Sequence, residues 1–196
     1  EFRRVLFRSE LTLEGTPLMN ENFRWKTAVN MSMNRNKVVS LHKDYKSFRY
    51  GSEGFSMAYD MWVKEGGKLG DIYGNGFERD ENGKIKLNET GNPIKVTGNN
   101  TLLGNANPDA LLGWSNTFTY KAFTLYFLID ARIGGDVMSL TQAHLDAMGV
   151  SKESGESRDR GYVEYEGIQF KDVPNFYGTV GGRNGISEYY MYDATN

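Results

Sequence analysis

The sequence predicts an all-β fold in which antiparallel strands form part of a large transmembrane β-barrel, an open sheet with long extracellular loops. Three observations support this prediction. Several runs alternate between apolar and polar residues over the length that a strand needs to cross a bilayer. The connections between these runs are short and long in turn. Finally, 23 glycines, 4 prolines and 13% aromatic residues favour strands and loops over helices.

Residues 1–9 are excluded from this reasoning. Their sequence, EFRRVLFRS, is encoded by GAG TTC AGA CGT GTG CTC TTC CGA TCT, which looks like a common sequencing adapter. We therefore interpret residues 1–9 as an adapter-derived scar and residues 10–196 as part of one barrel. On this interpretation the natural protein begins upstream of Glu10, and the chain is a fragment of a larger gene product.

The first predicted strands flank a short polar turn. Leu11–Gly15 alternates and is interpreted as the end of a strand, which Thr16 and Pro17 stop. Asn20–Asn22 forms the turn, and Phe23–Val38 is the longest alternating run. One face of that run carries Phe23, Trp25, Thr27, Val29, Met31 and Met33, and the other carries Arg24, Lys26, Ala28, Asn30, Ser32 and Asn34. The aromatic residues gather at its start, where an interfacial girdle would lie.

The clearest pair of strands is Leu112–Tyr120 and Phe123–Gly134, joined by Lys121 and Ala122. One face is apolar and suits lipid, whereas the other is largely polar and suits water. The apolar face includes Trp114, Phe118, Tyr120, Leu125, Phe127, Ile129, Ala131 and Ile133. A hairpin in a soluble β-sandwich shows the same alternation. The turn lacks the Asn-Gly sequence of a type I′ turn, so the surrounding sheet must impose its conformation.

Two long polar excursions separate these pairs, at about 40–110 and 136–187. The first contains two turns, Arg79–Gly83 and Asn88–Pro93, around a strand-like segment. The second is expected to begin with a helix at Thr141–Met148, capped by Thr141. A flexible charged stretch at Ser151–Arg160 and a loop strand at Tyr162–Phe170 follow. The excursion ends with a bend at Gly181–Gly185, and a further strand begins at Glu188–Asn196. Alternation of short turns with long loops is typical of outer-membrane barrels, whereas turns in a sandwich are of similar length at both ends.

The composition excludes several classes of protein. A formal net charge of −2 argues against a nucleic-acid partner, and the absence of cysteine excludes disulfides and thiolate metal sites. No cofactor or metal is expected. No run reaches the roughly 18 apolar residues of a membrane helix, but barrel strands need no such run.

No catalytic constellation is evident, so the chain is not predicted to be an enzyme. His42 and His144 lie far apart in loop regions, and we interpret them as solvated. Two carboxylate pairs have the residue type of glycosidase acids, Glu153 with Glu156 and Glu164 with Glu166. Charge on the wet face of a loop is the commoner explanation for such pairs.

Five residues are candidates for functional contacts. Asp130 and Arg132 fall on the predicted lumen face, where a pair of opposite charges is tolerated. They would either order the wall or contact whatever occupies the lumen. Trp62, Tyr73 and Tyr177 belong to the excursions and could stack on sugars or pack under a partner protein. Packing within their own loops is the alternative for each.

The same segments resemble the SusC/RagA family of TonB-linked outer-membrane transporters. LLGNANPDALLGWSNTFTYKAFTLYFLIDARIGGDV (102–137) looks like the late-barrel signature of that family. GDIYG (70–74), RDENG (79–83) and LTQAHLDAMGVSKESGESRD (140–159) are similar to its loops. LTLEGTP (11–17), NRNKVVSL (34–41) and TVGGRNGISEYYMYDATN (179–196) also fit, so the resemblance covers nearly everything from Glu10 onward.

This resemblance implies a barrel of about 22 strands in the outer membrane of Bacteroidota-type bacteria, with an N-terminal plug. It implies uptake of oligosaccharides or peptides, energised by a TonB complex that acts through the N-terminal part missing here. It also implies a SusD-like surface lipoprotein as a lid over the outer loops. The alternatives are a secreted β-sandwich that binds carbohydrate and, less favoured, a surface glycosidase.

Overall fold

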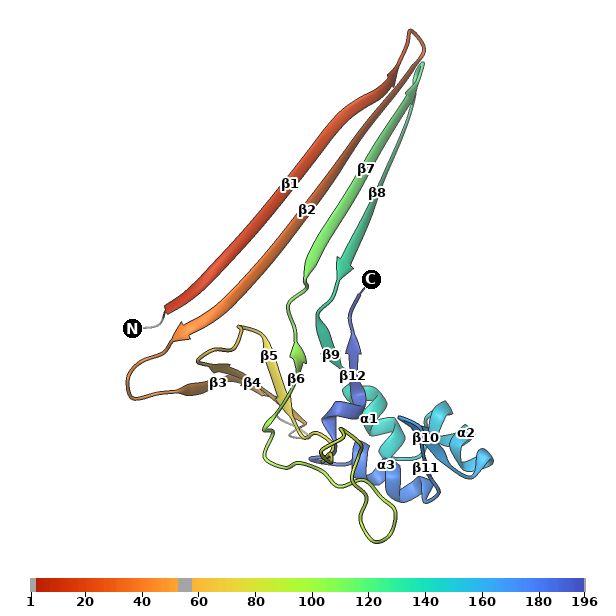
Figure 1. Ribbon diagram of the computed structural model, residues 1–196. Helices are drawn as coiled ribbons and strands as arrows, with labels where there is room; N and C mark the ends of the chain where they lie inside the picture. Colours follow the sequence, from red (N-terminus) through yellow and green to blue (C-terminus); the bar gives the residue numbers. More distant parts are fainter. Residues whose placement is uncertain (1–2, 53–57, 196) are drawn as a thin grey trace.

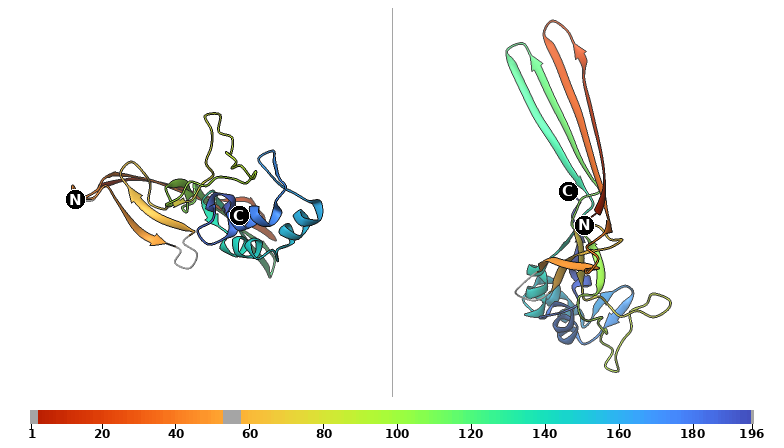
Figure 2. Two further views of the ribbon diagram at one scale, coloured as in Figure 1. Left: turned by 90° about the horizontal axis from the view of Figure 1, so that it is seen from below. Right: turned by 90° about the vertical axis from the view of Figure 1, so that its left-hand side faces the viewer.

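The computed structural model describes residues 3–52 and 58–195. Its longest strands form one antiparallel sheet in the order β1-β2-β7-β8. These strands are β1 (Arg3–Met19), β2 (Phe23–Ser40), β7 (Ala110–Tyr120) and β8 (Phe123–Ile133). We call this sheet the wall. It stands as a single layer, with both tight turns at one end and the excursions at the other (Figures 1 and 2). The predicted fold class is therefore confirmed, and the sheet is open in this chain.

The register of the wall keeps the predicted faces in line. Leu13, Val29, Trp114 and Ile129 lie opposite one another across the four strands. Because residues that are directly opposite share a face, the apolar positions of all four strands form one continuous surface. The polar positions form the other surface.

One expectation about β1 is wrong. Thr16 and Pro17 do not stop the strand, which continues to Met19. Instead, the pairing shifts by one residue, so that Gly15 faces Thr27 and Leu18 faces Trp25. Proline is tolerated because β1 is an edge strand of this sheet, and the bulge keeps Leu18 on the apolar face despite its even number. The strand also includes residues 3–9, whose adapter origin stays a prediction.

The two tight turns are joined to each other. Asn20 Oδ1 accepts hydrogen bonds from the backbone N–H groups of Asn22 and Phe23, at 3.0 and 2.8 Å. In the second turn, Lys121 has a φ of 51°, and its N–H donates to the Asn22 carbonyl at 2.8 Å. Positive φ is uncommon for a residue with a side chain, so the neighbouring hairpin does help to impose this turn, as the sequence predicts.

The first excursion forms a second four-stranded sheet, in the order β3-β4-β5-β6. Its strands are β3 (Ser47–Ser52), β4 (Tyr59–Lys64), β5 (Asp71–Gly74) and β6 (Thr101–Asn105). A small core of Val38, Leu41 and Val63 joins this sheet to the end of β2. Both predicted turns are present: Asp80 Oδ1 caps the first, and Asn88 Oδ1 caps the second.

The second excursion folds into a compact lobe, which we call the helical lobe. In chain order it contains β9 (Asp136–Met138), α1 (Leu140–Ala147), α2 (Lys152–Arg160), β10 (Val163–Tyr165), β11 (Ile168–Phe170), α3 (Val173–Gly181), η1 (Ser187–Tyr190) and β12 (Met191–Asp193). β12 pairs with β9 and leads back toward the lower end of β8 (Figure 1). The described residues include no helix that is both long and apolar enough to cross a membrane.

Several local expectations in this lobe need correction. The predicted helix is present, but Ser139 caps it in place of Thr141. Ser151–Arg160 is not a flexible stretch, because Ser151 caps the helix α2. Tyr162–Phe170 is a hairpin, since a turn at Glu166 and Gly167 divides it into β10 and β11. The strand expected at the end begins only at Met191, after a short 3₁₀ helix.

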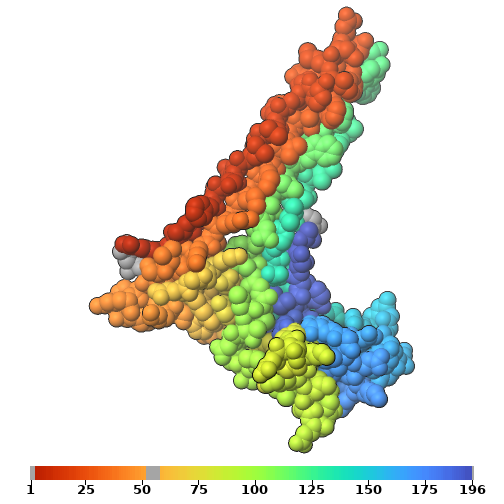
Figure 3. Space-filling view, in the orientation of Figure 1, coloured from red at the N-terminus to blue at the C-terminus, as the bar shows by residue number. Residues whose placement is uncertain are grey.

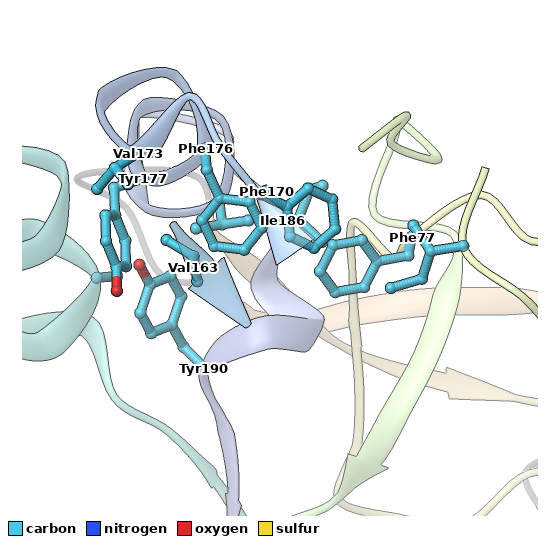
Figure 4. Close-up of a cluster of buried hydrophobic side chains, with 11 residues drawn as sticks. Phe77, Val163, Phe170, Val173, Phe176, Tyr177, Ile186 and Tyr190 are labelled. Carbon is cyan, nitrogen blue, oxygen red and sulfur yellow. The ribbon is translucent and has the colours of Figure 1, made fainter. Parts of the chain in front are cut away.

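The core of the helical lobe includes residues from both excursions (Figure 4). Phe176 and Ile186 are fully buried at its centre, and Phe77 packs against them from the first excursion. The remaining buried members are Ile85, Ala143, Val163, Phe170, Val173, Tyr177, Val180 and Tyr190. The two excursions therefore fold as one unit below the wall (Figure 3).

Candidate functional site

The apolar face of the wall is open. Trp114, Phe127 and Ile129 are 42%, 37% and 51% exposed, and Phe118 is partly exposed. Within the described residues no second sheet packs against them. A soluble protein rarely exposes a continuous apolar surface of this kind, whereas hydrocarbon covers it in a membrane barrel. The packing expected of a soluble β-sandwich is therefore not what the structure shows.

Two polar residues lie on this apolar face, and sequence reasoning did not single them out. Thr27 and Asn116 are directly opposite each other on β2 and β7. The indole N–H of Trp25 donates to Asn116 Oδ1 at 2.9 Å, and the indole N–H of Trp114 donates to Thr27 Oγ1 at 2.9 Å. Asn116 is buried, although its strand position faces outward. We call this pair of hydrogen bonds the indole clasp.

Aromatic rings surround the indole clasp. Trp25 stacks on Phe118 with centroids 5.6 Å apart, and Phe118 stacks on Phe127 at 6.0 Å. Trp114 meets the edge of Phe127 at 6.3 Å. This cluster lies in the half of the wall nearest the tight turns, where the sequence predicts an interfacial girdle.

Asp130 and Arg132 lie on the polar face of the wall, which we call the wet face. They do not form an ion pair with each other among the described contacts. Asp130 is exposed and stands beside Gly113, in one row with Asn30. Arg132 Nη2 donates to the Ala106 carbonyl at 2.8 Å. Arg132 therefore anchors the chain entering β7, while the Asp130 side chain is exposed on the polar face.

Three asparagines hold the loop between β4 and β5 over the same face. Asn36 Oδ1 accepts the Leu69 N–H at 2.6 Å, and the Leu69 carbonyl accepts from Asn105 and Asn107 at 3.0 and 2.6 Å. The loop therefore depends on side chains from β2 and from the segment entering β7. A cavity of about 500 Å³ lies beside it, lined in part by Asn34, Asn36 and Asn107.

The aromatic candidates occupy different environments. Trp62 is partly exposed on β4. Tyr73 is buried on β5, with Lys64 Nζ 3.6 Å from its ring centroid. Tyr177 is buried in the helical lobe, where its hydroxyl lies 3.1 Å from Ser157 Oγ. Burial raises the pKa of both tyrosines. Tyr73 and Tyr177 thus pack within the loops, which leaves Trp62 as the accessible member of this set.

A buried asparagine connects the two excursions. Asn75 Nδ2 lies within hydrogen-bond distance of the Asn184 carbonyl, Asn184 Oδ1 and the Gly185 carbonyl, at 3.1, 2.8 and 3.0 Å. Its Oδ1 accepts the Asn99 N–H at 3.1 Å. Asn184 has a φ of 57°, so the GGRNG segment is held in a strained turn against the first excursion. The sequence predicts only a bend at this segment.

An ion-pair network forms a second connection. Arg79 makes a bidentate pair with Glu166 at 2.7 and 2.8 Å and also donates to Glu188 at 2.6 Å. The other carboxylate oxygen of Glu188 accepts the Phe77 N–H. Hydrogen bonding from Arg79 lowers the pKa of Glu166. Glu166 therefore serves as a structural partner of a cation, which is the opposite of what a glycosidase acid requires.

The histidines lie in separate parts of the molecule. His42 follows β2, and its Nδ1 accepts the Asp44 backbone N–H at 3.4 Å, whereas His144 is on α1. Across residues 3–52 and 58–195, no three His, Asp or Glu side chains are grouped as ligands for a metal ion.

Two curated proteins and a solved structure are similar to this chain. No protein-family model matches the sequence. The TonB-dependent receptor P3 of Formosa agariphila is 25% identical over 155 residues, an alignment that covers 69% of this chain and 16% of the relative. The TonB-dependent receptor P39 of the same organism is 24% identical over 180 residues, covering 65% and 16%. The chain therefore spans about a sixth of the length of these curated relatives.

The fold matches a solved transporter over nearly its whole length. A structure of the RagAB peptide transporter aligns with 98% of this chain and 22% of that chain, with a TM-score of 0.62 and 11% identity. The same importer in a closed-closed state gives a TM-score of 0.60. The fold is thus that of part of an outer-membrane barrel. More particularly, the chain is similar to TonB-dependent receptors, which confirms the predicted resemblance. The similar proteins are receptors and transporters of the outer membrane.

Proposed function

We propose that this chain is part of the barrel of a TonB-dependent transporter that imports oligosaccharides or peptides across the outer membrane. The wall supports this proposal most directly, because it is a single sheet with one continuous apolar face and one polar face. Tight turns at one end and large folded loops at the other agree with the short periplasmic turns and long outer loops of such barrels.

The partners and cargo belong to the same proposal. A SusD-like lipoprotein would cover the excursions from outside, and a TonB complex would act through a part of the protein that this chain does not include. The names of the relatives support TonB dependence, and the name of the structural neighbour supports a peptide as one class of cargo. Asp130 would line the lumen, and Trp62 would offer a contact for cargo or lid.

Cysteine accessibility tests how the wall is oriented. Ile129→Cys and Asp130→Cys are adjacent on β8 and face opposite sides, and the chain has no cysteine of its own. In outer membranes that contain the full-length gene product, we expect a small water-soluble maleimide to label Asp130→Cys about tenfold faster, because hydrocarbon suppresses thiolate formation. Denaturation should equalise the two rates.

Two outcomes would contradict the proposal. A full-length product that stays soluble after lysis without detergent would support the β-sandwich. Equal labelling of the two cysteines in membranes would show that hydrocarbon does not cover the apolar face. Cargo class is tested separately by uptake of labelled oligopeptides and oligosaccharides into cells, with a protonophore as the control. Co-purification of a SusD-like lipoprotein would test the proposed lid.

A further inference from the structure

The register between β2 and β7 is not fixed by a short connection. Short turns set the pairing of β1 with β2 and of β7 with β8. By contrast, residues 41–109 separate β2 from β7, so no turn determines how these two central strands align. A slip of two residues would also leave every side chain on its present face. The alternation of apolar and polar residues therefore cannot select the observed register.

The indole clasp distinguishes between these registers. Both of its hydrogen bonds run between β2 and β7, each from an indole to a polar side chain one pair away along the apolar face. A slip that placed Thr27 opposite Phe118 would move each indole a further two residues from its acceptor. Thr27 Oγ1, which also donates to the Ser115 carbonyl at 3.2 Å, would then lose its indole donor, and Asn116 Oδ1 would lose the indole N–H that it accepts, while Asn116 Nδ2 has no partner among the described residues in the observed register. Each residue would face hydrocarbon with one hydrogen bond fewer, which disfavours the slipped register.

The tight turns oppose a slip in the other direction. In the observed register Tyr120 pairs with Phe23 at the very start of β2. Shifting β7 the opposite way would bring Tyr120 against the Asn20–Asn22 turn, which has no strand to pair with. It would also break the bond from the Lys121 N–H to the Asn22 carbonyl. The clasp and the turn contact therefore restrict the register from both sides.

We infer that the indole clasp is a register lock, which aligns the two hairpins of the wall when the barrel assembles in the membrane. This inference rests on the proposed function, because polar side chains on an outward face are costly only where hydrocarbon covers them. It assigns Trp25, Trp114, Thr27 and Asn116 a positioning role that is separate from transport. It also explains why two polar residues, Thr27 and Asn116, lie on a face that is otherwise apolar.

Disulfide trapping in the full-length protein tests the lock. Ala28→Cys with Ser115→Cys reports the observed register, because these residues lie opposite each other on the wet face. Ala28→Cys with Thr117→Cys reports the two-residue slip that moves each indole away from its acceptor. In an otherwise unchanged protein, we expect the first pair to cross-link in outer membranes and the second to stay at background.

The clasp is then removed with Thr27→Val and Asn116→Leu, which keep the size of each side chain. We expect cross-linking of the slipped pair to rise about tenfold, as loss of two hydrogen bonds between strands implies. Asn30→Leu, on the wet face of the same strand, is the matched control and should leave the slipped pair at background. Should the double variant fail to reach the membrane, Asn116→Leu by itself keeps the Trp114–Thr27 bond and should give an intermediate rise.

The outcomes separate the lock from the proposed function. Cross-linking of the observed pair alone in every variant, at the level of the unchanged protein, would overturn the lock and leave the transporter proposal standing. Absence of the unchanged protein from outer membranes would instead count against the transporter.

Discussion

At the scale of single residues, side chains that bridge distant segments hold the loops together. Asn75 and Arg79 lie close together in the first excursion, yet their partners lie near residues 166–188. A buried amide that loses its partners costs about 1–3 kcal/mol, so these residues matter more than the charged faces around them. Trp25 and Trp114 act in the same way on the wall.

The Arg79–Glu166 pair predicts a response to acid. The pKa of Glu166 is lowered from its ordinary 4.5 by hydrogen bonds from Arg79. A lowered pKa in the folded state contributes stability that is fully present above 4.5 and is lost as the pH falls through the folded value. The protection of the β10–β11 hairpin amides, measured as the intrinsic exchange rate at each pH divided by the observed rate, should therefore fall below about pH 4.5 in the membrane-embedded protein.

Arg79→Gln is the variant that isolates this effect. It should lower the protection of the hairpin amides at neutral pH and remove the further loss of protection that protonation of Glu166 causes in acid. Lys86→Gln is the control, since Lys86 pairs with the exposed Glu78 within the first excursion. An unchanged acid response in Arg79→Gln would assign the effect to other carboxylates.

At the scale of elements, tertiary contacts decide the helices. The sequence of α3, VPNFYGTVG, contains two glycines and two valines, and nothing in its propensity predicts a helix. It is helical because Asp172 caps it and because Phe176, Tyr177 and Val180 are buried against α1 and the hairpin. The helix α2 has no apolar face, and its buried side chains are Ser154 and Ser157. For this reason the periodicity of apolar residues could not reveal it.

The crossing of α1 and α3 depends on Gly181. A Cβ at this position would meet the Ala143 carbonyl oxygen at 2.4 Å and the Tyr190 hydroxyl at 2.8 Å. Gly181→Ala should therefore push the helices apart and destabilise the helical lobe by about 1–3 kcal/mol. Gly178→Ala, in the same helix, has nothing within 4 Å and should stabilise it by about 0.5–1 kcal/mol.

Limited proteolysis of the lobe in outer membranes compares the two variants. Faster cleavage within residues 140–190 is expected for Gly181→Ala, and slower cleavage for Gly178→Ala. The same rate in both would show that the close approach of α1 and α3 does not limit stability.

At the scale of the whole molecule, the wall depends on neighbours that this chain does not supply. Among the residues that the structure describes, nothing pairs with the outer edges of β1 and β8, and nothing covers the apolar face. Exposed edges and large apolar surfaces promote association. Residues 10–196 expressed without the rest of the barrel should therefore aggregate in detergent-free buffer, as light scattering after size-exclusion chromatography would show. A monomer that melts cooperatively would contradict the barrel interpretation.

The alternation of apolar and polar residues is sufficient to predict the wall: its strands, its two faces, and the order of short turns and long loops. These properties are local, because alternation with a period of two needs only neighbouring residues to be read. Three features arise from folding alone: Tyr73 and Tyr177 are buried, Asn75 binds Asn184, and the indoles of Trp25 and Trp114 donate to side chains on the neighbouring strand. Such contacts join residues about a hundred positions apart, and specific pairing at that separation leaves no periodic signal in the chain.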